Sequence, residues 1–190
     1  MKAADYVDWK KLLALVDELE TSKSPTSKRN AMLIDLGMHI ALRISDLLDL
    51  KWADIMSGGL PVEYIIRKEQ KTGKRREIAL NQRVRDHIKR YYHKQAPAEY
   101  VFINKNGAKL SQRYVNAEFS RLNKKHKLVK GTFSSHSLRK TWARHILKLN
   151  PNDVMVLNLL QEALKHSDIR ITRRYLGITG EEVRDLYLSV

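Results

Sequence analysis

The stretch ALKHSDIRITRRY, residues 163–175, brings one histidine, three arginines and one tyrosine within a few helical turns. The phenol of a tyrosine is a poor nucleophile at neutral pH, because its ordinary pKa is about 10. Cations around the phenol favour its phenolate, and a phosphate in front of it provides an electrophile. We therefore treat Tyr175 as a candidate nucleophile toward a phosphate.

The charge of the chain points to a polyanionic partner. Its 190 residues include 36 lysines and arginines against 21 aspartates and glutamates, which gives a formal net charge of +15. The sequence pI is close to 10.0. Such an excess favours nucleic acid first and an acidic membrane surface second, while a basic but merely well-solvated surface is the simpler alternative.

Missing features exclude other classes of protein. There is no cysteine, which excludes disulfides, thiolate metal sites and cysteine nucleophiles. No apolar run reaches the roughly 20 residues of a membrane span, and the N-terminal residues lack the apolar core of a signal peptide. We expect a cytoplasmic, nucleoid-associated protein that does not contact a membrane.

Apolar residues recur at helical spacing through most of the chain. Ser45 is the expected N-cap of a short helix, and Asn152 is expected to cap another whose apolar positions include Val154 and Val156. The predicted helices cover residues 6–20, 28–40, 45–50, 81–92, 111–127 and 136–149, a segment that starts at 152, and residues 181–188.

The residue pattern changes between positions 61 and 80, where it predicts a β-hairpin. Residues 62–66 and 77–80 are rich in β-branched and aromatic side chains, and a glycine-containing turn at 71–74 joins them. The tip is basic, with Lys68, Lys71, Lys74, Arg75 and Arg76. Residues 100–103 are predicted as a third strand. We expect one domain spanning residues 1–190, mainly α-helical with a small three-stranded antiparallel sheet.

Arg43 interrupts an apolar run between Leu42 and Ile44, so we expect it to be buried. A buried arginine is costly unless it meets an anion or a carboxylate. Asp46 is the candidate internal partner. One interpretation is an Arg43–Asp46 pair that joins two helices, and the other is an anion site.

His136 and Arg139 lie three residues apart on one predicted helix, so their side chains share a face. The chain repeats this spacing at His87 and Arg90, in a helix that we interpret as an exposed surface element. The context differs. His136 comes at a helix start, where the positive end of the helix dipole favours an anion, whereas His87 lies in mid-helix.

The order of these residues carries more information than any one of them. The chain gives Arg43, a basic hairpin, His136-x-x-Arg139, His166 and Tyr175, and in this order it resembles the catalytic domain of the tyrosine recombinases, the family of phage integrases and Xer-type recombinases. The matching stretches are ALRISDLLDLKWAD at 41–54, KTGK at 71–74, HSLRK at 136–140, LKHS at 164–167 and RYLG at 174–177.

The resemblance implies a role for each matching position. Arg43 and Arg139 would hold the two non-bridging oxygens of a DNA phosphate, and Tyr175 would attack it and remain bonded as a 3′-phosphotyrosine. His136 would assist proton transfer at the tyrosine, and His166 would hydrogen-bond the phosphate.

The remaining implied roles concern the leaving group and the flanking DNA. A hairpin lysine would protonate the leaving 5′-oxygen, and Lys71 fits the family pattern, with Lys74 as the alternative. The family needs no metal and no cofactor. The expected additional DNA contacts are Lys74, Arg75, Lys140, Lys165 and Arg173.

The chain also departs from the family pattern. Ala41 and Lys165 stand where the family commonly has glycine. Most relatives carry an N-terminal core-binding domain, which we expect to be absent from residues 1–190. Either the chain is an excised domain, or it is a short recombinase like the fimbrial-switch invertases. Half of the DNA clamp would then be missing, which predicts weak, salt-sensitive DNA binding.

Three functions remain open at this point. The leading one is site-specific recombination of double-stranded DNA, by a protein that is a monomer alone and a homo-tetramer on two synapsed sites. The helix over 181–188 either packs on its own domain or, as the resemblance implies, reaches a neighbouring protomer. The others are a type IB topoisomerase and a catalytically silent DNA-binding regulator.

Overall fold

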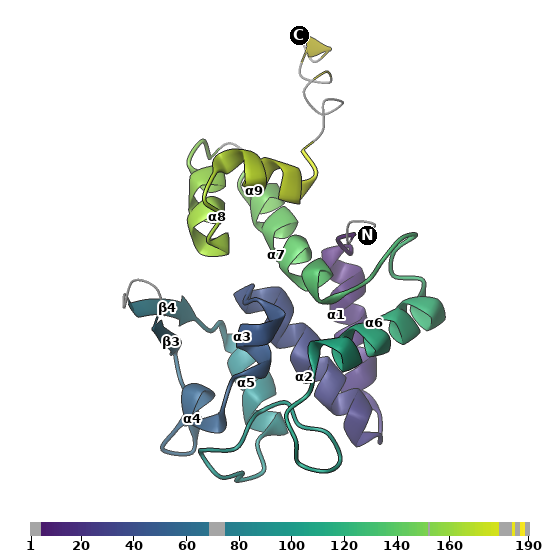
Figure 1. Cartoon of the computed structure of the whole chain (residues 1–190), viewed down its shortest axis with the longest axis vertical. Coiled ribbons are helices and arrows are strands. Elements are labelled where there is room, and N and C mark those ends of the chain that lie inside the picture. Colours follow the sequence, from purple (N-terminus) through teal and green to yellow (C-terminus); the bar gives the residue numbers. More distant parts are fainter. Residues whose placement is uncertain (1–4, 69–74, 152, 179–183, 185–186, 189–190) are drawn as a thin grey trace.

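The computed structural model describes residues 5–68, 75–151, 153–178, 184, 187 and 188. Lys71 and Lys74, at the predicted hairpin tip, lie outside these residues, as does most of the helix predicted over 181–188. Figure 1 shows the arrangement of the described elements.

Helices dominate the described part of the chain. They are α1 (Trp9–Thr21), α2 (Pro25–Ile40), α3 (Ile44–Leu48), α4 (Trp52–Ile55), α5 (Gln82–Tyr91), α6 (Gln112–His126), α7 (Ser135–Leu149), α8 (Val156–Leu164) and α9 (Ile169–Leu176). The strands are β1 (Met56–Ser57), β2 (Leu60–Pro61), β3 (Tyr64–Lys68) and β4 (Arg75–Ala79). The mainly α-helical fold is confirmed, and α4 was not predicted.

Helix α2 forms the centre of the main core. It starts at Pro25, after the N-cap Ser24, whose hydroxyl accepts a hydrogen bond from the Ser27 amide. Almost every residue from 29 to 40 is buried, because α1, α5 and α7 all pack against this helix. The C-terminal end of α2 is therefore held firmly where the chain enters the segment that carries Arg43.

The predicted hairpin is confirmed as β3 and β4, an antiparallel pair in which Ile65 faces Ile78. The predicted third strand is wrong. Residues 100–103 form only single-residue bridges, Lys51 with Tyr100 and Ile103 with Lys109. Val101 and Phe102 are consecutive and both buried, so this apolar run reflects a segment enclosed on all sides and not a strand with two distinct faces. The described strands form two two-stranded sheets, β1–β2 and β3–β4.

A second, smaller apolar cluster joins α7, α8 and α9. Its buried members are Ala41, Ala143, Val156, Leu160, Leu164 and Leu176. Figure 1 shows α8 and α9 together at the opposite end of the molecule from α4 and α5. Helix α7 contributes to both clusters, with Leu138 in the main core and Ala143 in the smaller one.

Helix α5 is not the exposed element that we predicted around His87. His87 is 2% exposed, and its Nδ1 lies 2.7 Å from the Oδ2 of the buried Asp35. Burial alone raises the pKa of Asp35, but hydrogen bonds from His39 and His87 outweigh it and hold the pKa well below its usual range. His87 is buried together with Val84 and Ile88 of α5.

Two predicted helix starts also need correction. Helix α3 has Arg43 as its N-cap in place of Ser45. Helix α8 has Met155 as its N-cap, Val154 lies before the helix and is 90% exposed, and the predicted cap Asn152 lies outside the described residues. In the described part of the chain, no helix combines the length and the apolar character that a membrane crossing requires.

Candidate active site

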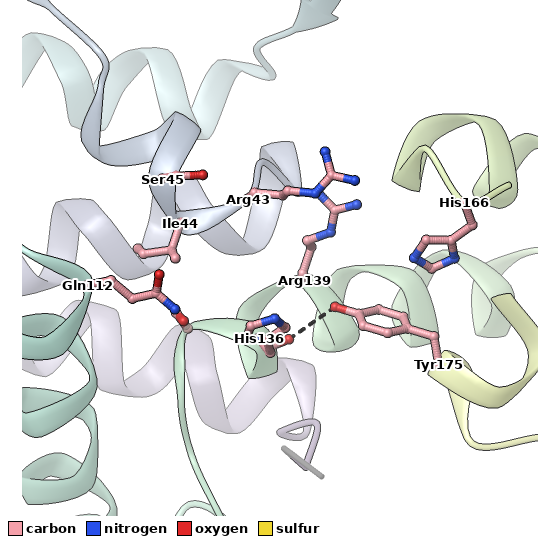
Figure 2. Close-up of a pocket in the computed structure, with 9 residues that line it drawn as sticks. Arg43, Ile44, Ser45, Gln112, His136, Arg139, His166 and Tyr175 are labelled. Carbon is pink, nitrogen blue, oxygen red and sulfur yellow. Dashed lines mark hydrogen bonds between the residues drawn. The ribbon is translucent and has the colours of Figure 1, made fainter. Parts of the chain in front are cut away.

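A cavity of about 290 Å³ gathers the predicted catalytic residues (Figure 2). It lies where α3, α6, α7 and α9 meet the turn between α8 and α9. Its lining consists of Arg43, Ile44, Ser45, Gln112, Ser135, His136, Arg139, His166 and Tyr175. The structure thus brings together every predicted catalytic residue within the described chain, while Lys71 lies outside it.

Arg43 is exposed, which contradicts its predicted burial. Its neighbours Leu42 and Ile44 are 7% and 8% exposed, but its own extended backbone at the start of α3 turns the side chain outward into the cavity (Figure 2). The expected pair with Asp46 is not among the ion pairs of the described residues; the Asp46 carbonyl instead accepts a hydrogen bond from Arg67 at 3.1 Å. The interpretation of Arg43 as a purely structural partner of Asp46 is therefore wrong.

Arg139 is buried, and backbone carbonyls from two other segments hold its guanidinium. Its Nη1 donates to the Ala41 carbonyl at 2.8 Å, and its Nη2 donates to the Leu164 carbonyl at 2.5 Å. These bonds tie α7 to the C-terminal ends of α2 and α8. The position of the Arg139 charge is therefore fixed by three helices before any ligand binds.

Both anchoring segments end in a left-handed residue. Ala41 caps α2 with a φ of 49°, and Lys165 caps α8 with a φ of 54°. This conformation costs an L-residue about 1–2 kcal/mol and costs glycine almost nothing. At both positions the family commonly has glycine. The strain lies next to the carbonyls of Ala41 and Leu164, which hold Arg139.

Tyr175 lies on α9 with its side chain between α7 and His166. Its hydroxyl donates to the His136 carbonyl at 3.3 Å, and its ring meets the His166 ring edge to face, with 5.1 Å between centroids. Burial raises the pKa of Tyr175 to about 12, although the charge and hydrogen bond of Arg139 act in the opposite direction. In the free protein Tyr175 is therefore a neutral phenol.

His166 lies in the turn before α9. Its Nδ1 is 3.0 Å from the hydroxyl of Thr172, a residue with no exposed surface. Burial lowers the pKa of His166, and the charges of Arg139 and Arg43 lower it further. The imidazole is therefore neutral at pH 7, and Nε2 is the ring nitrogen left for a ligand.

Two long helices begin at the cavity. His136 is the second residue of α7, after the N-cap Ser134, and its side chain is exposed. Gln112 is the first residue of α6. Helix N-termini favour anions, because their amide groups point outward with partial positive charge.

The buried hydroxyl of Ser135 has no hydrogen-bond partner within the described structure. Its amide donates to the Asn116 side chain at 3.0 Å, which fixes the start of α7 against α6. We did not predict Ser135 or Gln112 as cavity residues. The available signal was their position directly after Ser134 and Ser111, two serines of the type that caps helices.

The predicted DNA-contact residues have different positions. Lys140 is half buried, with its Nζ 5.4 Å from the centroid of the Tyr175 ring. Lys165 and Arg173 are exposed. Arg75 is described only as the first residue of β4, and Lys74 lies outside the described residues.

In the described part of the chain, no three histidine, cysteine, aspartate or glutamate side chains lie close enough together to hold a metal ion.

Comparison with known proteins agrees with this geometry. The chain is 28% identical to the probable integrase/recombinase YoeC of Bacillus subtilis (strain 168), over 92% of each chain. It is 30% identical to the tyrosine recombinase XerD of Halalkalibacterium halodurans, over 87% of this chain and 54% of that protein. The chain therefore spans nearly all of the one and about half of the other.

A solved structure shows the same fold. The XerH site-specific recombinase, in a post-cleavage complex with a palindromic difH substrate, superposes with a TM-score of 0.70 at 20% identity, over 98% of this chain and 53% of that one. The phage integrase family model matches residues 6–182. The chain therefore belongs to the phage integrase family.

Proposed function

We propose that this chain is a site-specific tyrosine recombinase, which cleaves and rejoins double-stranded DNA through a 3′-phosphotyrosyl intermediate. The observation that carries the proposal is the single cavity that contains a tyrosine hydroxyl, two arginines and two histidines from segments far apart in the sequence. Membership of the phage integrase family supports the same activity.

In this proposal Arg43 and Arg139 bind the non-bridging oxygens of the scissile phosphate. Planar guanidinium groups suit such oxygens, since they donate two parallel hydrogen bonds. Negative charge on these oxygens grows as phosphorus becomes five-coordinate, so cations fixed in advance stabilise the transition state more than the ground state. The carbonyl anchors of Arg139 provide such fixation.

Tyr175 is the proposed nucleophile. A bond forms between its Oη and phosphorus, the bond from phosphorus to the 5′-oxygen breaks, and the phenol proton leaves. The raised pKa of Tyr175 means that this proton does not leave unaided at neutral pH. We assign its removal to His136, whose side chain lines the same cavity.

His166 is proposed to donate a hydrogen bond to the phosphate. If the Thr172 hydroxyl donates to Nδ1, the proton of the neutral imidazole resides on Nε2, and a donor then faces the cavity. The lowered pKa of His166 supports a neutral donor in this role.

The leaving 5′-oxygen needs a proton, and we assign it to Lys71, with Lys74 as the alternative. In the sequence, both lysines lie between β3 and β4. We further propose that Lys74, Arg75, Lys140, Lys165 and Arg173 contact flanking DNA phosphates.

We also propose that the chain acts as one catalytic domain that is a monomer alone and forms a homo-tetramer on synapsed DNA, at the bacterial nucleoid. Four large apolar residues between the last residue of α7 and the first turn of α8 are exposed: Leu149, Val154, Met155 and Leu159, at 62%, 90%, 53% and 57%. Exposed apolar surface marks interaction sites where it is contiguous, which supports an assembly role for this segment.

A covalent-adduct assay tests the proposed activity. Nicked duplexes cut from the DNA that flanks the gene are incubated with the protein, and a denaturing gel then detects protein bonded to DNA. We expect an adduct with the wild type and none with Tyr175→Phe. An undiminished adduct in Tyr175→Phe contradicts the proposal, and relaxation of supercoiled plasmid without any site requirement indicates a topoisomerase.

A further inference from the structure

The nucleophile faces a set of charged and titratable groups from several elements. From α7 come Arg139 and the His136 carbonyl, and from the turn before α9 comes the ring of His166. Arg43 lines the same cavity from the start of α3. One further residue places a cation over the face of the Tyr175 ring.

That residue is Lys140. Its Nζ lies 5.4 Å from the centroid of the Tyr175 ring, within the range of a cation–π interaction. Lys140 and His136 are four residues apart on α7, so they lie one turn apart on the same face. Tyr175 lies along this row, with its hydroxyl on the His136 carbonyl and its ring under the Lys140 ammonium.

We propose that Lys140 is a positioning residue that stabilises the phenolate of Tyr175, an inference that rests on the proposed recombinase activity. A phenolate spreads negative charge over its ring, so a cation on the ring face binds the phenolate more strongly than the phenol. The contact therefore strengthens as the reaction proceeds, which is the condition for lowering a barrier.

The same contact acts in both directions of the reaction. In cleavage the phenol proton leaves to a base, the Oη–phosphorus bond forms, and the phosphorus–O5′ bond breaks as O5′ gains a proton. In rejoining the phenolate is the leaving group. Lys140 transfers no proton in either step; it holds the ring and its charge.

The surroundings of Lys140 limit the pH range over which it is charged. Burial lowers the pKa of Lys140, Asp5 raises it, and Arg144 lowers it. The net direction is downward, so Lys140 loses its charge at a lower pH than a solvated lysine does. An arginine at this position keeps its charge over the whole range.

The first test measures Tyr175 in the free protein. Replacing Tyr175 with 3,5-difluorotyrosine makes the phenol more acidic, and ¹⁹F NMR then follows its titration. We expect Lys140→Met to raise the pKa of this phenol by roughly half a unit and Lys140→Arg to leave it unchanged. Lys148→Met is the matched control, because Lys148 is exposed on the same helix.

The second test measures single-turnover adduct formation on the nicked duplex. We expect Lys140→Met to react about two- to fivefold more slowly than the wild type, and Lys140→Arg to react faster than Lys140→Met because it keeps the cation. The ratio of the Lys140→Arg rate to the wild-type rate should rise at alkaline pH, where the lysine loses its proton. A merely structural role for Lys140 does not produce this pH dependence.

The third test separates the nucleophile from the leaving group. A duplex with sulfur in place of the bridging 5′-oxygen has a leaving group that needs no proton. This substrate should restore the rate of Lys71→Ala, if Lys71 is the general acid, and leave Lys140→Met slow. If this substrate fully restored the rate of Lys140→Met, Lys140 would act on the leaving group, and the inference would be overturned.

The outcomes for the two proposals are distinguishable. Absence of an adduct with the wild type contradicts the recombinase assignment, while the NMR titration still decides whether Lys140 acts on the phenol. The inference about Lys140 is overturned, whatever the DNA result, if the Tyr175 phenol has the same pKa in Lys140→Met and in the wild type. Circular dichroism must show that both proteins are folded.

Discussion

Helices α5 and α7 carry the same His-x-x-Arg spacing, and the fold uses it in opposite ways. On α5 the histidine is buried against Asp35, and Arg90 lies at the surface in a two-bond pair with Glu20, at 2.5 and 3.2 Å. On α7 the histidine is exposed, and Arg139 is buried between two carbonyls. The pattern alone does not separate a structural element from a phosphate site.

The difference between the two helices lies in the kind of acceptor. A carboxylate neutralises a cation, so Arg90 beside Glu20 has little charge to offer a DNA phosphate. A carbonyl accepts a hydrogen bond and brings no formal charge, so it can orient a guanidinium without neutralising it. Four predictions can break or sharpen this comparison, and the largest effect is expected at Arg139.

Arg139→Ala should reduce the rate of adduct formation by about 10³-fold, the scale observed when a fixed charge-stabilising donor is removed. Arg90→Ala, the matched change on α5, should leave the rate within about twofold of the wild type, since exposed ion pairs contribute little. Single-turnover kinetics on the nicked duplex measures both. Equal losses in the two variants would show that the phosphate site is not confined to α7.

The two histidines should separate activity from stability. His136→Ala should slow adduct formation by about 10²-fold, as expected for a lost acid–base group, and leave the urea midpoint unchanged. His87→Ala should lower the free energy of unfolding by about 2–3 kcal/mol, because it removes the partner of the buried Oδ2 of Asp35, and keep the rate per folded molecule. The comparison fails if His87→Ala slows the chemistry as much as His136→Ala does.

Asp35 should make stability depend on acid pH. Its folded pKa lies below its unfolded value, so its contribution to stability is fully present above the unfolded pKa of about 3.9 and is lost as pH falls toward the folded pKa. Urea unfolding between neutral pH and pH ~3 measures this slope.

Asp35→Asn should flatten the acid slope, whereas Asp86→Asn, an exposed change on α5, should retain it. An unchanged slope in Asp35→Asn would mean that other carboxylates govern acid unfolding. This prediction concerns the buried contact between Asp35 on α2 and His87 on α5, and adduct formation at neutral pH serves as its control.

The sequence predicted the site better than it predicted the burial of individual residues. The order of Arg43, His136, Arg139, His166 and Tyr175 was enough to expect one site, because in this order the residues resemble the tyrosine recombinase pattern. Helix α7 was also predicted within a residue, because Ser134 and Asn150-Pro151 mark its ends.

Burial depends on neighbours that lie far away in the sequence, and here the predictions failed. Arg43 has apolar neighbours and is nevertheless exposed, because its extended backbone turns it away from them. His87 is buried because Asp35, 52 positions away in sequence, supplies a buried acceptor. Neither the exposure of Arg43 nor the burial of His87 can be inferred from the spacing of nearby residues in the sequence. The prediction for residues 100–103 failed for a related reason, since a connection whose central residues Val101 and Phe102 are buried has the same local composition as a strand.

The smallest expected effect concerns the carbonyl anchors of Arg139. Ala41→Gly should raise the free energy of unfolding by about 0.5–1 kcal/mol. Glycine removes the left-handed strain at φ 49°, but it also increases the entropy of the unfolded chain, which offsets part of this stabilisation. Lys165→Gly should behave alike at the end of α8. Urea titration measures both changes, and Ala143→Gly inside α7 is the control with the opposite sign, since glycine destabilises a helix interior.

Because the Ala41 carbonyl holds Nη1 of Arg139, the strain at Ala41 is coupled to the position of the charge that we propose binds the phosphate. A stabilised Ala41→Gly protein with an unchanged adduct rate would show that the carbonyl needs only the left-handed turn, whichever residue makes it. A stabilised protein that reacts more slowly would show that the methyl group of Ala41, packed in the smaller apolar cluster, also fixes the anchor of Arg139.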